Sequence, residues 1–265
     1  MEFGLDDRGV VRVAGAEAAH FLHNLVTNDV EGLEIGRSRF AALLTPQGKI
    51  LFDFLIHRRG ETEFLLDVAA DKTAELAKRL ALYRLRARIE ISDESGRLAA
   101  LVALEGDPPD PRAALGARRI GPRAEAPPVS ASARAAYEAR RVALGVPQGG
   151  VDFAYGDAFP HDVNMDLLNG VDFRKGCYVG QEVVSRMRHR GEIRRRVMRV
   201  AALDAPLETG AAVLDGDLPV GIVGTVAGGE ALALLRVDRA QDAERGGRTL
   251  TAGGRRLRRM DETAS

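Results

Sequence analysis

The sequence predicts an α+β fold with mixed or antiparallel sheets, followed by a small C-terminal β-barrel. Up to residue 104, segments with strand-like alternation are interspersed with segments that have the apolar spacing of a helix. Prolines then crowd residues 105–132, which indicates a linker or a long surface excursion. From residue 193 to residue 259, short apolar runs are separated by Gly, Pro and Asp, which is typical of a small barrel.

The individual elements follow from local signals. Pro46-Gln47-Gly48 is a turn between two strand-like segments and predicts a hairpin. Leu76, Leu80 and Tyr83 recur at helical spacing, and Gly145-Val146-Pro147 ends a later helix. The expected strands are residues 9–13, 38–45, 49–57, 62–68, 87–92 and 97–104. The expected helices are residues 15–25, 70–86 and 133–144, with a further helix beginning at Gln181.

Composition narrows the class of protein. The 265 residues are enough for two or three domains, and 45% of them are hydrophobic. The formal net charge is zero, so no overall field attracts nucleic acid or a membrane, and we expect neither as a direct partner. The single cysteine, the acidic N-terminus without a signal sequence and the short apolar runs together predict a soluble, cytoplasmic protein.

Residues 175–182, KGCYVGQE, are the strongest candidate for chemistry. A helix that begins at Gln181 would direct unpaired N–H groups and partial positive charge toward Cys177, and Lys175 adds a cation, so we expect the thiol to have a lowered pKa and to be reactive. Gln and Glu could bind a heterocyclic ring edge. The alternative is a glycine-rich loop around a buried, inert cysteine. The candidate residues of this octapeptide are Lys175, Gly176, Cys177, Tyr178, Gly180, Gln181 and Glu182.

Other polar residues are candidate ligand contacts. Arg186 and Arg190 could hold a carboxylate or belong to a solvated face. Asp53, within an apolar strand, either points to solvent or serves a site. Asn28 lies at a helix end, as a simple stop or as a site residue, and the polar segment before the octapeptide adds Asp162 and Asn164. No metal site is expected, because the helical pair His20 and His23 lacks a third ligand.

The octapeptide resembles the hallmark K-G-C-[FY]-x-G-Q-E of the YgfZ-type folate-binding proteins, which are relatives of the glycine-cleavage T-protein, an aminomethyltransferase. The resemblance extends over nearly the whole chain. It includes VRVAGAEAAHFLHNLVTNDV, LLTPQGKILFDFLI and the segment from GVPQGG through FPHDVNMD to GVDFRKGCYVGQEVVSRMRHRG.

This resemblance implies a ring of three domains around a channel that binds tetrahydrofolate, with two ferredoxin-like α/β units and the barrel. We assign residues 1–45 and 132–190 to a folate-binding domain, residues 46–131 to a second domain and residues 191–265 to the barrel. The family implies a role in the maturation or repair of iron–sulfur enzymes, some of which modify tRNA. Cys177 and Lys175 are then the reactive residues, and iron–sulfur client proteins are transient partners.

The sequence departs from the family pattern at two positions, and these departures change what we expect of the activity and of pterin binding. Phe52-Asp53 retains one carboxylate where the T-protein has paired aspartates, so we do not expect a glycine-cleavage aminomethyltransferase. Ala143 stands where many relatives place a pterin-binding glutamate, and Asp162 is our candidate substitute. The leading interpretation is a folate-dependent accessory factor for iron–sulfur proteins. The alternatives are a folate-dependent one-carbon transferase and a non-catalytic folate-sensing module.

Overall fold

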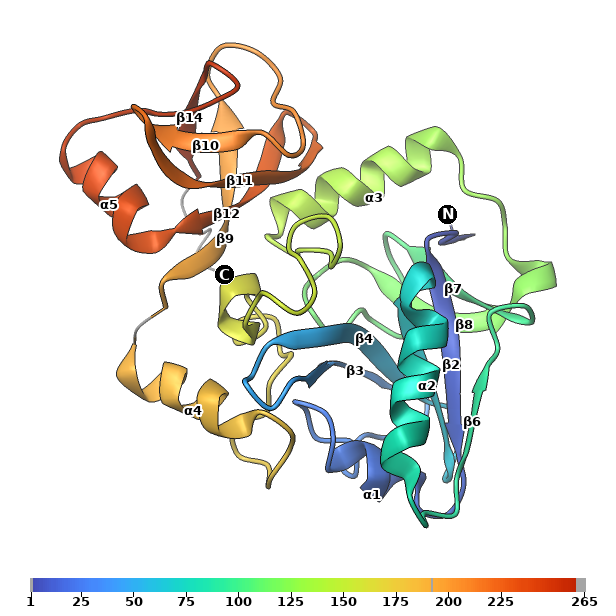
Figure 1. The fold of residues 1–265 in the computed structure, drawn as a ribbon. Helices are drawn as coiled ribbons and strands as arrows, with labels where there is room; N and C mark the ends of the chain where they lie inside the picture. Colours follow the sequence, from blue (N-terminus) through green and yellow to red (C-terminus); the bar gives the residue numbers. More distant parts are fainter. Residues whose placement is uncertain (1, 192, 261–265) are drawn as a thin grey trace.

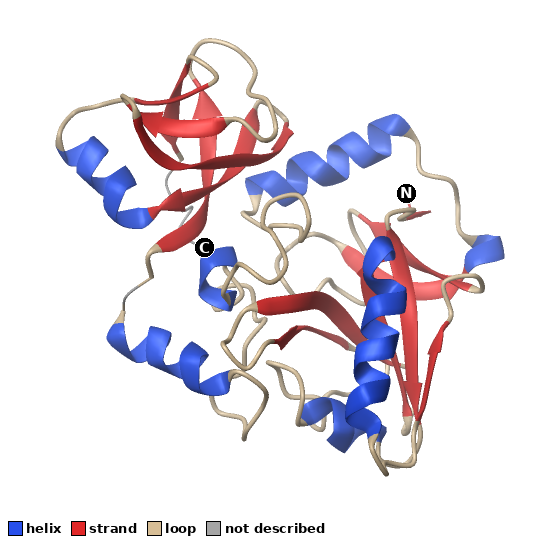
Figure 2. Ribbon diagram, in the orientation of Figure 1, coloured by secondary structure: helices blue, strands red, loops and turns tan. Residues whose placement is uncertain are grey.

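The computed structural model describes residues 2–191 and 193–260. It contains a five-stranded sheet, a three-stranded sheet and a closed barrel of six strands (Figure 1; Figure 2). The α+β fold with a C-terminal barrel is therefore confirmed. No helix within the described ranges combines the length and apolar character needed to cross a bilayer.

The five-stranded sheet is antiparallel, in the order β3-β4-β5-β2-β6. Alternation along β4 sends Phe52 and Phe54 into a core beneath α1 and α2, while Leu55 enters a second core on the opposite face. Both faces of the sheet are thus buried. The elements are β2 (Arg8–Ala14), α1 (Ala18–His23), β3 (Ser38–Leu44), β4 (Ile50–Arg58), β5 (Glu63–Ala69), η1 (Ala70–Lys72), α2 (Thr73–Arg84) and β6 (Glu90–Asp93).

The three-stranded sheet has the order β1-β7-β8, from β1 (Glu2–Gly4), β7 (Leu98–Ala103) and β8 (Ala117–Pro122). A short η2 (Arg123–Glu125) leads to α3 (Ala131–Ala143), whose Tyr137 packs against Phe3. The side chain of Ser130 caps α3 by accepting a hydrogen bond from the N–H of Ala133.

Residues 105–132 are therefore more than a linker, and the prediction for this segment is wrong in part. β8 pairs with β7 along its whole length and buries Arg118. The composition of the segment hid this strand because its prolines lie outside the strand or, as Pro122, at its last position, where they do not interrupt the pairing. A buried arginine also has no apolar signature. β1 was also not predicted, being only three residues long.

The barrel has the strand order β10-β11-β12-β9-β14-β13 and its own apolar core, which confirms the expectation for residues 193–259. α5 was not predicted, because only Ala240 and Ala243 of this polar segment are buried. Arg141 of α3 donates a hydrogen bond to the hydroxyl of Thr225, which ties α3 to the barrel. The elements are β9 (Arg195–Ala202), β10 (Ala212–Asp215), β11 (Leu218–Ala227), β12 (Glu230–Arg236), α5 (Val237–Arg245), β13 (Leu250–Ala252) and β14 (Arg255–Arg259).

Several predicted boundaries differ from the structure. The strand expected at residues 87–92 begins only at Glu90, and the helix expected at residues 70–86 is α2, which spans Thr73–Arg84. The helix expected at residues 15–25 is shorter, since α1 ends at His23. The predicted domain boundary between residues 45 and 46 lies in the hairpin turn that joins β3 to β4. Because hairpin strands pair with each other, the five-stranded sheet does not divide at that point.

Candidate functional site

The octapeptide forms a loop that is held from beneath by Lys175. Its ammonium group donates to the backbone carbonyls of Val26 at 2.7 Å, Asn28 at 3.2 Å and His23. All three ammonium N–H groups can therefore be satisfied by the end of α1 and the turn that follows. Burial lowers the pKa of Lys175 to about 8. The structure thus gives the side chain that we predicted to be catalytic an anchoring position.

The rest of the loop is fixed by one aromatic ring and one glycine. Tyr178 is buried, which raises the pKa of its hydroxyl, and the ammonium group of Lys175 lies 5.1 Å from its ring centroid. Gly180 has a φ of 82°, and a Cβ there would stand 2.6 Å from the carbonyl oxygen of Thr45. Only glycine fits this contact with the β3–β4 turn. α4 (Gln181–Arg190) begins at the next residue, as predicted.

Cys177 is exposed on this loop. The alternative interpretation, a cysteine buried in a core, is therefore wrong. Gly176 and Glu182 are also exposed, while Gln181 is half-buried. The loop consequently presents the only thiol of the chain to the surface, while Lys175 and Tyr178 hold it from the inner side.

We expect Lys175→Met to weaken this anchor. The substitution keeps most of the side chain's length but leaves the carbonyls of His23, Val26 and Asn28 without their donor, which costs about 1–3 kcal/mol for a buried polar group. Urea unfolding at neutral pH measures this loss. Lys78→Met on the exposed face of α2 is the matched control and should change the free energy of unfolding by less than about 0.5 kcal/mol. Equal effects of the two substitutions would contradict an anchoring role.

The side-chain amides of Asn28 and Asn164, two of the predicted ligand contacts, are already hydrogen-bonded to backbone carbonyls. The Asn28 amide donates to the carbonyls of Phe40 at 2.8 Å and Asn169 at 2.6 Å. The Asn164 amide donates to the carbonyl of Val197 at 3.1 Å, among others. These bonds use both N–H groups of each amide, so the two asparagines hold loops together.

Asp53 does not point to solvent. It is buried, and its carboxylate accepts a hydrogen bond of 2.7 Å from the hydroxyl of Tyr155. It lines a cavity of about 20 Å³ whose walls include Arg8, Arg112 and Arg118. That volume corresponds to about one water molecule, so the residues around Asp53 do not fit a pterin ring.

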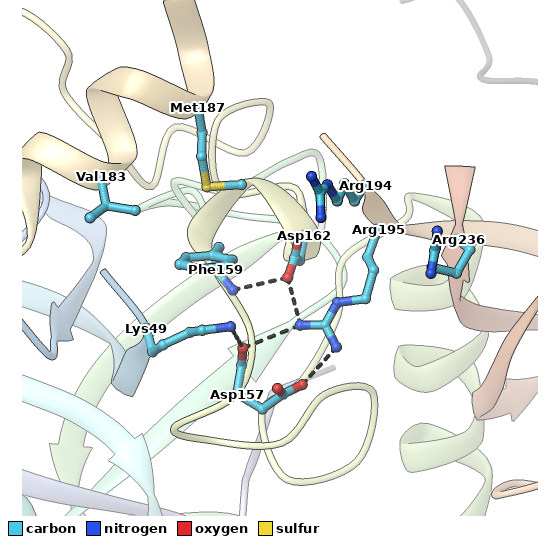
Figure 3. A pocket seen from close by; sticks show the side chains of 9 residues that line it. All are labelled: Lys49, Asp157, Phe159, Asp162, Val183, Met187, Arg194, Arg195 and Arg236. Atoms are coloured by element: carbon cyan, nitrogen blue, oxygen red, sulfur yellow. Dashed lines mark hydrogen bonds and ion pairs between the residues drawn. The ribbon is translucent and has the colours of Figure 1, made fainter. Parts of the chain in front are cut away.

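Asp162 lies elsewhere, in a cavity of about 420 Å³ (Figure 3). It is buried and accepts hydrogen bonds from the N–H of Phe159 at 3.1 Å and from Arg195 at 2.9 Å. Although these donors lower its pKa, burial outweighs them, and the pKa of Asp162 is raised. Sequence reasoning missed most other lining residues of this cavity. The sequence feature that could have pointed to this cavity was Lys49, because it is one of only four lysines among the 38 lysine and arginine residues.

The arginines of α4 differ in position. Arg186 is exposed, whereas the guanidinium of Arg188 lies 4.0 Å from the ring centroid of Phe173, close to the loop. The side chain of Arg190 lies outside the described residues. His20 and His23 each contact one carboxylate, Glu31 and Asp29 respectively, and no metal-binding group of three side chains occurs within residues 2–191 and 193–260.

The structure therefore distributes the predicted site residues over three places. The loop carries Cys177, the small cavity holds Asp53, and the larger cavity holds Asp162. The larger cavity also contacts α4 through Val183 and Met187, which lie in the first and second turns of the helix that follows the loop. The candidate site with chemical reactivity is the loop.

Comparison with known proteins agrees with this architecture. Residues 4–116 match the family model of the GCVT N-terminal domain, and residues 194–261 match that of the CAF17 C-terminal beta-barrel domain. The crystal structure of the glycine cleavage system aminomethyltransferase T from Bartonella henselae superposes with a TM-score of 0.75. The superposition covers 99% of this chain and 85% of that chain at 18% identity. The T-protein-like fold is thus confirmed.

Two curated relatives are similar in sequence. The mitochondrial iron-sulfur cluster assembly factor IBA57 homolog of Neurospora crassa is 32% identical over 227 residues, which covers 73% of this chain and 52% of that protein. The chain thus spans about half the length of this relative. The mitochondrial iron-sulfur cluster assembly factor IBA57 of Homo sapiens is 33% identical over 241 residues, with 78% of this chain and 67% of that protein covered.

These relatives correct one expectation and narrow another. Both are named as mitochondrial proteins, which contradicts the cytoplasmic location that we expected from the sequence. The relation to the T-protein fits the fold, whereas the narrower YgfZ-type assignment stays a prediction. From its similarity to the human protein over two thirds of that protein's length, this chain belongs to the family of the iron-sulfur cluster assembly factor IBA57.

Proposed function

We propose that the protein is an accessory factor in iron–sulfur cluster assembly and that Cys177 is its point of contact with the cluster. The observation that carries this proposal is the exposure of the chain's only thiol on a loop anchored by Lys175. A thiolate is the usual protein ligand of iron in such clusters. The family relationship supports the same role.

The number of cysteines restricts how the protein acts. An iron–sulfur cluster usually takes four thiolates, and this chain has one cysteine. The remaining ligands must therefore come from a client protein, a carrier or a small thiol. When the Cys177 thiol forms an Fe–S bond, one thiolate of the donor leaves and takes up the proton that Cys177 gives up, so the oxidation states of iron and sulfur do not change.

A cluster-transfer assay tests the proposal. The probe is the [2Fe–2S] complex of glutathione, mixed with the full chain under argon. We expect the visible absorbance of the cluster to co-elute with the protein in gel filtration. Absence of cluster from the protein fraction, with the chain shown to be folded and the thiol shown to be reduced, would contradict the proposal.

We propose tetrahydrofolate as a ligand of the same protein. The T-protein-like fold and the octapeptide support this proposal, while the small cavity beside Asp53 opposes binding of the pterin at that place. A ligand that binds only the native state stabilises it, by about 2.7 kcal/mol at a concentration of 100 times Kd. We therefore expect the melting temperature to rise with tetrahydrofolate. An unchanged melting temperature at saturating ligand would reject this second proposal and leave the role of Cys177 untouched.

A further inference from the structure

The cavity of about 420 Å³ lies where the start of β4, the short helix η3 (Pro160–Val163), α4 and the barrel meet (Figure 3). Its volume is within the range of small-molecule sites, about 300–1,000 Å³. Three of its lining residues are apolar or aromatic, four are cationic and two are acidic. They are Phe159, Val183 and Met187; Lys49, Arg194, Arg195 and Arg236; and Asp157 and Asp162.

Part of the wall is fixed by bonds that exist without a ligand. Arg195 binds the carboxylate of Asp157 at 2.7 Å and that of Asp162 at 2.9 Å. The ammonium group of Lys49 donates to the backbone carbonyl of Asp157 and lies 3.6 Å from the ring centroid of Phe159. Both carboxylates are therefore already paired, and the aromatic ring has a set position. A ligand would meet a preorganised surface.

The net formal charge of the side chains that line the cavity is positive. Four cations and two carboxylates give 4 − 2 = +2. Arg236 pairs at 2.6 Å with Asp238, which does not line the cavity. The guanidinium of Arg194 makes no ion pair with any carboxylate in the portion of the chain that the structure describes. Arginine is well suited to hold a ligand carboxylate through two parallel hydrogen bonds.

We infer that this cavity binds a small organic anion with a flat apolar body. The carboxylate of the ligand pairs with Arg194, and its body packs against Phe159 and Met187. A cation of similar shape is repelled by the positive lining, and a neutral one gains only the apolar contact. This function goes beyond cluster assembly, because it does not require Cys177. The cavity also adjoins the octapeptide loop, since its lining residues Val183 and Met187 belong to the helix that begins at the end of the octapeptide.

Titration calorimetry on the full chain tests the inference with p-aminobenzoylglutamate, an aromatic amide that carries two carboxylates. Benzamidine, an aromatic cation, is the control ligand. We expect the anion to bind, benzamidine not to bind, and Arg194→Glu to weaken the anion at least tenfold. Arg258→Glu makes the same change of charge on the exposed face of β14, outside the cavity, and should leave the affinity unchanged. Met187→Glu places the charge on the apolar wall and should weaken binding as well.

Tetrahydrofolate serves as a second probe that separates this inference from the folate proposal. If it binds and Arg194→Glu weakens it, the cavity accepts folates among other anions. If p-aminobenzoylglutamate binds with the expected dependence on Arg194 and tetrahydrofolate does not bind, the cavity is confirmed and the folate proposal fails. Absence of p-aminobenzoylglutamate binding at low-millimolar concentration, or equal affinity in the Arg194→Glu and Arg258→Glu proteins, overturns the inference whatever tetrahydrofolate does.

Discussion

Cys177→Ser is expected to abolish cluster acceptance from the glutathione complex, with the absorbance of the protein fraction falling to background. The reason is that serine removes the one thiolate of the chain, and a neutral hydroxyl is a poor ligand for iron. The fold should not change. Because Cys177 is exposed, the free energy of unfolding should stay within about 0.5 kcal/mol of the wild-type value.

Two measurements distinguish loss of the ligand from loss of the loop. Ser185→Ala, within α4, is the matched control: it removes a hydroxyl from the same helix–loop unit and should retain cluster acceptance. Circular dichroism of Cys177→Ser should equal that of the wild type. Cluster retention by Cys177→Ser would place the iron ligand elsewhere. The reactivity of the thiol stays a prediction, and alkylation of the folded wild type by iodoacetamide would support it.

Arg118→Met is expected to cause the largest loss of stability, about 3–5 kcal/mol, because it leaves a buried carboxylate with only one of its two guanidinium partners. Arg118 and Asp67 are 2% and 0% exposed, and the Nε of Arg118 lies 2.7 Å from a carboxylate oxygen of Asp67. Arg8 binds the other oxygen at 2.6 Å and cannot replace the lost bonds. Urea unfolding at neutral pH measures the effect.

The next residue along β8 is a matched control. Arg119 alternates to the other side of the strand and pairs with Glu2, with both side chains partly exposed. Arg119→Met should therefore cost only about 0–1 kcal/mol, the usual value for a surface pair. If the two substitutions destabilise the protein equally, the buried pair does not have the role that its geometry indicates.

The ion pair of Arg118 and Asp67 should make the stability of the protein depend on pH. Burial alone would raise the pKa of Asp67, but Arg118 and Arg8 hold it below its ordinary value. A depressed carboxyl pKa contributes stability above the unfolded value of about 3.9, and that stability is lost as pH falls through the folded pKa. The excess stability of the wild type over Arg118→Met should thus shrink progressively as the pH is lowered from about 4 toward the folded pKa of Asp67.

Local signals determined much of the fold. The alternation of apolar residues and the Pro46-Gln47-Gly48 turn predicted the β3–β4 hairpin, and glycine followed by Gln181 predicted the start of α4. The octapeptide identified the loop that presents Cys177. These features depend on residues close together in the chain, so their physical causes, side-chain period and backbone conformation, can be seen in a short stretch of sequence.

Only the tertiary structure decided what the polar side chains do. Lys175 is an anchor because the end of α1, some 150 residues earlier, supplies its acceptors. Arg118 is buried because β8 places it opposite Asp67, which no compositional signal reveals. The cavity brings Lys49, Phe159 and Arg236 together from distant segments. A charged residue has the same local pattern whether it faces water or a buried partner, and its partner is chosen by packing over long separations along the chain.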